Sequence, residues 1–533
     1  MMKSMVSPAQ GEVMALIMES LQDEVWLSTG RPAECWKVLN DFDTLDALLS
    51  IVLVSGLPDE PELVELLGDM VDFGFNGLMV RVRQNDEDAI EYLKDLEQNI
   101  MAAADAGALQ PEGLAMIQKR LGEYRRLLSE EFIHCIQSLE TEQAARDRED
   151  EEEIISSPEQ MQEFLSEMVV GCPSEFEFQD ALQSQLGLIP AEGLGVVAQM
   201  LLTSDEVMLK DVVPLMLLNQ DVVSANQVAR VLAEYPQSVT GKSLSRMIRI
   251  RNWLSPETRT WVDRAIQKAK KKGVVMEQAS PCQLIKLLAC PLDGSGAQGV
   301  MALFKNGRDF HLGGFVLKEN VGIVDAFCSP PASRKDLEGN MKMAAEQVFS
   351  KTVDAQWLEQ QLPHFLALSM ESGHLAEPAV IQVMEWLGIE QWNPEKLCFR
   401  QALLPLLTMD TADQAVINKT LKNSARLADR NFMGSWFEYG SEFNKALENL
   451  PLESPRKAQR LLCQQYFEQY RERWFERMVR LALWATYTGK QNTVLAHDCA
   501  VIAHLINTGS ALEDIPLLFK LAGYSIDQCF EPL

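Results

Sequence analysis

The sequence has little of what a secreted or membrane-spanning protein needs. Its ten cysteines are scattered over 533 residues and form no C-x-x-C pair, so neither a disulfide framework nor a paired zinc site is indicated. The most apolar stretch, residues 47–57, contains two serines and is too short to cross about 30 Å of hydrocarbon. Glu12 and Glu19 interrupt the first apolar segment, which excludes a signal peptide there. We therefore expect free thiols in a reducing cytoplasm.

Motifs of catalysis are also lacking. The chain has six histidines and no H-E-x-x-H. The Asp293–Gly296 turn lacks the G-K-[ST] ending of a phosphate loop, no G-x-G-x-x-G opens a helix, and the chain has no G-x-S-x-G elbow. His364 and His374 are ten residues apart with a glycine between them, which is not the spacing of a helical metal pair. Cys499 lies between His497 and His504 but precedes an apolar run, so a buried structural thiol is expected. The sequence predicts no catalytic residue, no cofactor and no metal site.

Basic charge is scarce as well. The chain has 48 Lys and Arg against 77 Asp and Glu, a net charge of −29, which argues against phosphate-backbone binding across the whole surface. Residues 1–153 hold 33 of these acids and 12 of the basic residues. The 47% of apolar residues is ordinary for a chain with a real core, and the length allows roughly three domains.

Helical periodicity dominates what is present. Residues 61–70 and 112–128 carry apolar stripes at i, i+3 and i+4 spacing, which predicts an N-terminal acidic helical bundle over residues 1–145. The charge run 146–153 and the Ser-Ser-Pro break after it indicate an acidic linker over 146–158. An acidic docking tail is the functional alternative for this run.

Short helices with regular breaks are expected over residues 159–275. Stretches of about 12–16 residues alternate with breaks such as 203–205 and 219–224. Ser224 is of a residue type that is common at the start of a helix. The run SDEVMLKDVVPLMLLNQDVVSANQVARVLAEYP resembles HEAT and armadillo repeats. That resemblance implies stacked helix pairs that bury their apolar faces against neighbouring pairs. No fixed period emerges, so an irregular helical array is the alternative.

The pattern changes over residues 276–334. Four short apolar runs, 282–290, 299–304, 310–317 and 321–327, are separated by turn residues. Asn306-Gly307 favours a hairpin with positive φ at both positions, and the glycines of the Asp293–Gly296 turn are explained by tight chain reversal. The fold class predicted is therefore mainly α: an irregular, HEAT-like helical array with a small antiparallel β-sheet insertion around 281–328.

A C-terminal helical domain is predicted for residues 335–533. Pro363 and Pro405 are expected to kink or split two of its helices. Residues 455–488 are predicted as helix, and their aromatic-rich part, 459–485, is interpreted as core.

One segment stands out electrostatically. Residues 242–272 contain ten Lys and Arg against two acids, with Trp253 and Trp261 interleaved. The candidate partner-binding residues are Arg246, Arg249, Arg251, Trp253, Arg259 and Lys268. A structural role, an acidic protein partner and nucleic-acid phosphates remain open for this segment.

The function predicted is a non-catalytic cytoplasmic interaction or scaffold protein that binds a protein partner through a helical-repeat surface. One alternative is an enzyme with a site at the sheet–helix junction that uses Asp325, His311 or His364, and a metal-dependent enzyme is one form of this alternative. The other is a nucleic-acid-associated adaptor that uses the basic segment. No membrane association is expected, and the oligomeric state is not predicted.

Overall fold

The chain divides into two compact units. The first comprises Met1–Met247 with Ser255–Met276, and the second comprises Ile248–Leu254 with Glu277–Leu533. The computed structural model describes residues 42–55, 61–83, 86–110, isolated residues between 113 and 172, and then 174–186, 191–219, 221–278, 281–373, 375–389, 392–407, 413–438, 441–447, 450–451 and 454–528. The predicted linker 146–158 lies outside the described residues, and the five-part domain division stays a prediction.

Three helices form most of the described core of the N-terminal part of the first unit. They are α4 (Phe42–Ser50), α5 (Pro61–Arg83) and α6 (Glu87–Asp105), with the π-helical turn Ile51–Ser55 after α4. Their apolar stripes meet in one cluster in which Leu48, Val71 and Met79 have no measurable exposure. Asp86 caps α6 by accepting from the Ala89 N–H and pairs with Arg81. These contacts account for the helical segment that the sequence predicts here.

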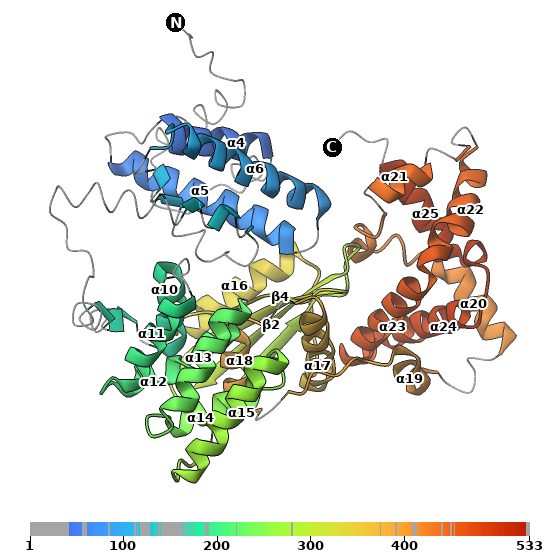
Figure 1. Ribbon diagram of the computed structural model, residues 1–533. Helices are drawn as coiled ribbons and strands as arrows, with labels where there is room; N and C mark the ends of the chain where they lie inside the picture. The colour runs from blue at the N-terminus through green and yellow to red at the C-terminus, as the bar shows by residue number, and fades with distance from the viewer. Residues whose placement is uncertain are drawn as a thin grey trace, which may run out of the picture. The chain divides into compact units, whose positions relative to one another are not determined.

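A series of short helices completes the first unit (Figure 1). It comprises α10 (Glu175–Leu186), α11 (Ala191–Thr203), α12 (Val207–Val212), a 3-10 turn (Leu215–Leu218), α13 (Val222–Glu234), α14 (Gly241–Ile250) and α15 (Pro256–Lys271). The helices α11, α13 and α15 lie side by side in sequence order. Near the start of both helices Thr258 on α15 donates to Asn226 on α13, and near their ends Lys268 donates to the Ala233 carbonyl. Helices α13 and α15 are therefore parallel.

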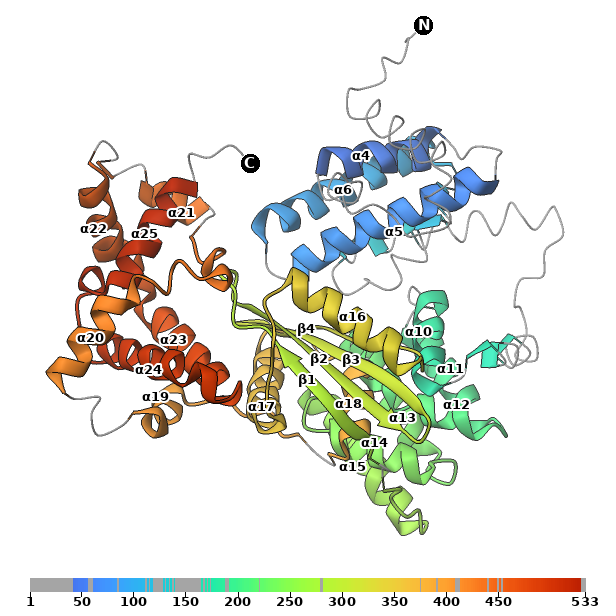
Figure 2. The same ribbon diagram turned by 180° about the vertical axis from the view of Figure 1, so that it is seen from behind.

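A five-stranded antiparallel sheet lies in the second unit, in the order β4-β3-β2-β1-β5 (Figure 2). Its strands are β1 (Gln283–Ala289), β2 (Ala297–Asn306), β3 (Asp309–Lys318), β4 (Gly322–Cys328) and the two-residue β5 (Lys351–Thr352). The first four confirm the strands predicted from the sequence, and β5 adds an edge beside β1. The fold is mainly α with a small antiparallel sheet inserted.

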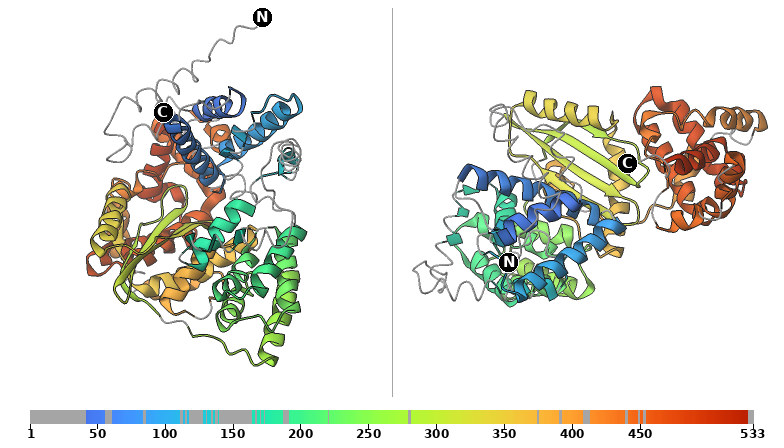
Figure 3. Two further views of the ribbon diagram at one scale, coloured as in Figure 1. Left: turned by 90° about the vertical axis from the view of Figure 1, so that its left-hand side faces the viewer. Right: turned by 90° about the horizontal axis from the view of Figure 1, so that it is seen from above.

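Helices cover both faces of this sheet (Figure 3). The helix α16 (Arg334–Gln347) packs Leu337 and Met341 against Leu288, Leu303 and Leu312 on one face. On the other face, α17 (Ala355–Glu371) and α18 (Pro378–Leu387) pack against β4 and β3. Side chains of this layer also bond the backbone along β4, since Ser369 accepts from the Ile323 N–H and Glu377 from the Ala326 N–H. The outer edge of β4 is thereby covered.

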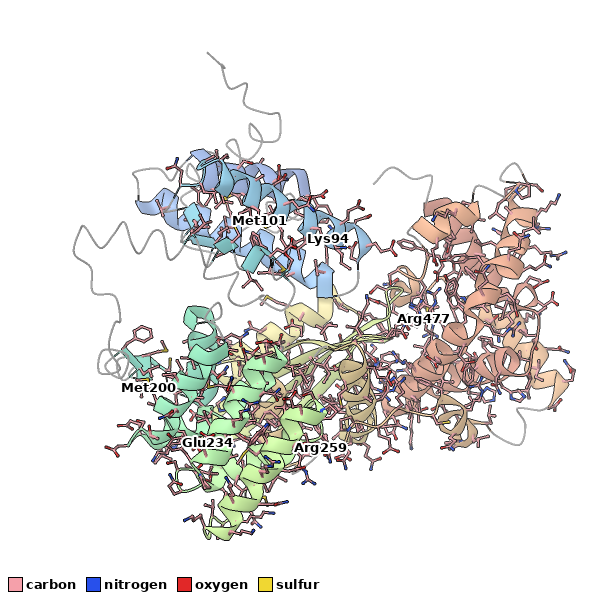
Figure 4. All side chains as sticks on the ribbon, viewed as in Figure 1. Lys94, Met101, Met200, Glu234, Arg259 and Arg477 are labelled. Atoms are coloured by element: carbon pink, nitrogen blue, oxygen red, sulfur yellow. The ribbon has the colours of Figure 1, made fainter. Side chains whose placement is uncertain are left out.

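The rest of the second unit is helical. It comprises α19 (Phe399–Leu403), a 3-10 turn (Leu404–Leu406), α20 (Gln414–Ser424), a 3-10 turn (Asn431–Met433), α21 (Ser441–Leu447), α22 (Pro455–Gln465), a 3-10 turn (Phe467–Tyr470), α23 (Arg471–Tyr487), 3-10 turn Lys490–Asn492, α24 (Thr493–Asn507), 3-10 turn Leu512–Asp514 and α25 (Pro516–Gln528). Trp474, Phe475 and Trp484 of α23 are at most 1% exposed, which confirms that the aromatic stripe is core. The side chains that fill this part are visible in Figure 4.

Local details differ from the sequence expectations at several points. The predicted helix 455–488 is broken by the turn Phe467–Tyr470, next to which Tyr466 packs on the Phe443 ring of α21 at 5.3 Å. The helix α17 continues through Pro363, whereas the chain leaves α-helical geometry at Leu404, next to Pro405. Asp221, and not Ser224, caps α13.

The hairpin between β2 and β3 is also displaced from its expected position. Asn306 pairs with Asp309 as the last residue of β2, and Gly307 has a positive φ of 59°. Among the described residues other than glycine, Asn320 alone has a positive φ, so the expectation that Asn306 adopts one was wrong.

Candidate functional site

The predicted basic segment is divided between buried and exposed side chains. Arg246 is fully buried and Arg249 is 3% exposed, although both were expected on a partner-binding surface. Arg246 donates to the Asp211 carbonyl at 2.6 Å and its guanidinium lies over the Phe176 ring at 4.7 Å. It also lies 3.8 Å from Glu175, within the first unit. Burial alone would raise the pKa of Glu175, but the charges of Arg246 and Lys242 hold that pKa below its ordinary value.

Arg249 and Trp253 have structural partners within the second unit. Arg249 Nη1 is 3.2 Å from Glu385 Oε1 on α18, and the indole N–H of Trp253 donates to the Trp392 carbonyl at 3.1 Å. Trp253 is 2% exposed. The assignment of Arg246, Arg249 and Trp253 to a docking surface was therefore wrong, because each side chain is buried and contacts a residue that is distant in the sequence.

The other three predicted residues keep some access to solvent. Arg251 is half-buried, and Arg259 is exposed with a loose 3.9 Å contact to Asp263. Lys268 is exposed, although its Nζ donates to the Ala233 carbonyl at the end of α13 at 2.7 Å. Figure 4 shows Arg259 on α15. The exposed remainder of the predicted patch therefore lies mainly on α15.

An arginine–tryptophan–arginine group adjoins these residues. The guanidinium carbon of Arg264 lies 4.6 Å from the centroid of the Trp261 ring, and that of Arg230, on α13, lies 5.4 Å from it. Both arginines are exposed and Trp261 is half-buried. Trp261 and Arg264 lie within the predicted basic segment 242–272, whereas Arg230 lies outside it and was not predicted. We call Arg230, Trp261, Arg264, Lys268 and Lys271 the α13–α15 basic face.

This face has the spacing of a helical stripe. Arg264, Lys268 and Lys271 follow one another at i, i+4 and i+7 on α15, opposite its buried side of Thr258, Val262, Ala265, Ile266 and Ala269. No ion pair of Arg230, Arg264, Lys268 or Lys271 occurs among the described residues. The lysines in the last turn also offset the negative end of the helix dipole, so part of this charge stabilises α15 itself.

The residues of the predicted enzyme site do not come together. His311 lies on β3 and stacks on Trp386 of α18 at 4.9 Å, whereas Asp325 on β4 is paired with Val316. Five residues along β3 separate His311 from Val316, which corresponds to about 17 Å and to opposite faces of the sheet. His311 and Asp325 therefore cannot act on one substrate atom.

His364 belongs to a different environment, inside the second unit. Its Nδ1 accepts from the Leu397 N–H at 3.1 Å, and its Nε2 lies 2.8 Å from Arg480 Nη2 on α23. Both ring nitrogens thus face donor groups, although only one nitrogen of a neutral imidazole can accept a hydrogen bond. Burial, followed by the charges of Arg480 and Lys396, lowers the pKa of His364 to about 3. The residue is a neutral core histidine and not a poised base near pH 7.

Helix α23 contributes a buried charge cluster that the sequence analysis missed. Arg477 binds Glu319, which follows β3, through Nε at 2.9 and 3.1 Å from the two carboxylate oxygens and also through Nη2. Arg473 binds Glu438 at 2.6 Å. Arg480 is 4% exposed, and its Nε and Nη1 lack hydrogen-bond partners. Its guanidinium lies over the rings of Phe365 and Phe399 at 4.9 and 5.4 Å. The cluster links α23 to α17 through His364 and to the end of β3 through Glu319. Removing one partner of a buried ion pair leaves the other charge unpaired, which destabilises the fold.

The Asp293–Gly296 turn supports the same cluster. A Cβ at Gly296, whose φ is 81°, would overlap the Glu319 side chain, and a Cβ at Gly294 would lie 1.5 Å from the Ser435 carbonyl oxygen. Asp293 accepts from the Ala297 N–H at 2.7 Å. The tight turn predicted from the sequence is confirmed, and its glycines also permit the close approach of neighbouring chain segments.

Cysteine and metal chemistry are not organised in the part of the chain that the structure describes. The eight described cysteines are free thiols, and burial raises the pKa of Cys499. No group of three potential metal-ligating side chains occurs among the described residues, and His374 lies outside them. Among the described helices none is long and apolar enough to cross a bilayer.

Comparison with known proteins shows similarity without a known activity. Residues 190–273 are similar to the family described as the Y4lR second domain, and residues 400–530 to the Y4lR C-terminal helical domain. The chain is 26% identical over 288 residues to an uncharacterized protein, y4lR, of Sinorhizobium fredii (strain NBRC 101917 / NGR234). The alignment covers 52% of this chain and 54% of that protein, so the chain spans about half the length of this relative. No solved structure matches the chain. The resemblance to HEAT and armadillo repeats stays a prediction, and the matched segments of the chain are similar to Y4lR proteins.

Proposed function

We propose that the protein is a non-catalytic interaction protein that binds an acidic protein partner through the α13–α15 basic face. The observation that carries the proposal is the Arg230–Trp261–Arg264 group, in which two exposed arginines share one half-buried tryptophan ring. Holding an arginine over a ring restricts the side chain in advance, so less conformational entropy is lost when a partner binds. Tryptophan and arginine are the residue types that contribute most at protein interfaces.

Charge favours a protein partner over a nucleic acid. The chain carries a net −29, so a long polyanion would be repelled by much of the protein while it contacts one basic face. A partner with a short acidic segment meets that face alone. We further propose that binding takes place in the cytoplasm, where the eight described free thiols would stay reduced.

The enzyme alternative has less support. His311 and Asp325 lie on opposite faces of the sheet, and His364 is held neutral in the core by its burial and by Arg480. General acid–base work near pH 7 needs a group whose pKa lies near 7. The interaction proposal therefore rests on the exposed face, and the buried cluster is assigned a structural role.

The test is affinity capture with a charge-reversal pair. Arg230→Glu with Arg264→Glu should weaken capture of a partner from native lysate at least tenfold, because each lost ion pair at the interface costs about 1–2 kcal/mol. The matched control is Lys422→Glu with Arg426→Glu, which reverses two exposed cations on and just after α20. Equal capture by both variants would refute the proposal, and so would a co-purified species that ribonuclease or deoxyribonuclease removes.

A further inference from the structure

Two exposed guanidinium groups are held close together on the first unit. Because the carbons of Arg264 and Arg230 lie 4.6 and 5.4 Å from one ring centroid, they are at most 10.0 Å apart. A guanidinium held over an aromatic ring keeps the N–H groups on its edge for oxygen acceptors, and its planar fork fits a carboxylate with two parallel hydrogen bonds. The two guanidinium groups at the Trp261 ring can therefore each bind a carboxylate, and their carbons are no more than 10.0 Å apart.

Helical geometry translates that separation into a sequence spacing. Acidic side chains at i and i+4 of a helix are about 6 Å apart, and those at i and i+7 are about 10 Å apart along the axis. Two carboxylates at i and i+4, or at i and i+7, of a second helix therefore fall within the largest separation that the Trp261 ring allows between the Arg230 and Arg264 guanidinium carbons.

We infer that the α13–α15 basic face recognises an acidic helix whose carboxylates lie in one row, with two of them bound by Arg230 and Arg264. This inference rests on the proposed function and names the partner chemistry of the same face. This recognition differs from general electrostatic attraction because a bidentate arginine binds a carboxylate in one defined position and orientation. A lysine acts as a point charge and does not impose that geometry.

The experiment uses the full chain and two labelled helical peptides of identical composition, each with four glutamates in an alanine–glutamine background. In the row peptide the glutamates stand at i, i+4, i+7 and i+11, and in the scattered peptide they are spread around the helix. Fluorescence anisotropy at about 20 mM salt should give at least a tenfold lower Kd for the row peptide. Raising the salt to about 200 mM should weaken both peptides.

Two conservative variants provide the decisive comparison. Arg264→Lys keeps the charge but removes the fork over Trp261, and it should reduce the row preference to about threefold or less. Arg259→Lys makes the same change on the same helix at an exposed arginine paired loosely with Asp263, and it should leave the preference unchanged.

The outcomes separate the two proposals. Equal affinity for both peptides, or equal effects of the two variants, would overturn the recognition of a carboxylate row. If charge reversal at Arg230 and Arg264 still abolishes capture of a protein partner, the proposed function would survive that result. Tighter binding of a short DNA duplex than of the row peptide would overturn the inference in favour of phosphate recognition.

Discussion

Replacing His364 should remove a specific part of the pH dependence of stability. The folded protein holds the pKa of His364 at about 3, whereas an unfolded histidine titrates near about 6.5. Between these values the unfolded state binds a proton that the folded state does not, so stability rises with pH. The sign follows from the contacts, since protonation would place a second positive charge 2.8 Å from Arg480 Nη2. The contribution is complete above about pH 6.5 and is lost progressively as the pH falls below it.

The magnitude can be worked from that shift. Each pH unit below about 6.5 costs 1.36 kcal/mol of unfolding free energy until the folded pKa is reached. Lowering the pH from 7 to 5 should therefore cost the wild-type protein about 2 kcal/mol through His364 alone. His364→Gln has no titrating ring and should lose this part of the pH response, while its amide oxygen can still accept from Arg480.

Tryptophan fluorescence suits the measurement, because Trp357, Trp436, Trp474 and Trp484 are all buried in the second unit. Urea titrations at pH 7 and pH 5 should give a wild-type loss about 2 kcal/mol larger than that of His364→Gln. His497→Gln, a partly exposed histidine on α24, is the matched control and should keep the wild-type response. Equal pH responses of the wild type and His364→Gln would refute the assignment, and so would wild-type stability that rises on acidification.

Three further outcomes are expected. Arg249→Ala should lower the unfolding free energy by about 2 kcal/mol or more because it removes a buried guanidinium and its ion pair with Glu385, whereas Arg264→Ala should change it by less than about 0.5 kcal/mol; thermal melting checks both. Gly294→Ala should lower the melting temperature of the second unit because its Cβ would lie 1.5 Å from a carbonyl oxygen. Gly339→Ala, in α16 with open space around it, should raise the melting temperature. A higher melting temperature for Gly294→Ala than for Gly339→Ala would contradict the packing described. Cys398, the exposed thiol among the described cysteines, should react first with a thiol reagent, and peptide mapping after partial labelling would show whether a different cysteine leads.

The sheet could be predicted because its signals are local. Turn residues at Asp293–Gly296, Asn306-Gly307 and 318–320 separate four apolar runs, and each run became a strand with its neighbour in antiparallel register. The strand β5 could not be found this way, because two residues carry no periodicity. The break between α22 and α23 was missed for a similar reason: the aromatic residues there are compatible with helix, and tertiary packing decides their conformation.

The buried cluster on α23 illustrates a different limit. Arg473, Arg477 and Arg480 read as the polar side of an amphipathic helix, yet Arg477 and Arg480 are 3% and 4% exposed. Their partners, Glu319, Glu438 and His364, are between 35 and 158 residues away in the sequence. A single sequence does not reveal such pairing, since a solvated arginine and a buried, paired arginine have the same spacing on a helix.

The two halves of the basic segment make this limit concrete. Lys242, Arg246 and Arg249 on α14 follow the i, i+4, i+7 spacing, and so do Arg264, Lys268 and Lys271 on α15. The first stripe meets carboxylates, since Glu175 lies beside Lys242 and Arg246 and Glu385 beside Arg249. The second stripe meets no carboxylate among the described residues and stays exposed. Because apolar burial determines which side of a helix faces inward, whereas distant acids determine whether its cations are neutralised, only the second stripe is available to a partner.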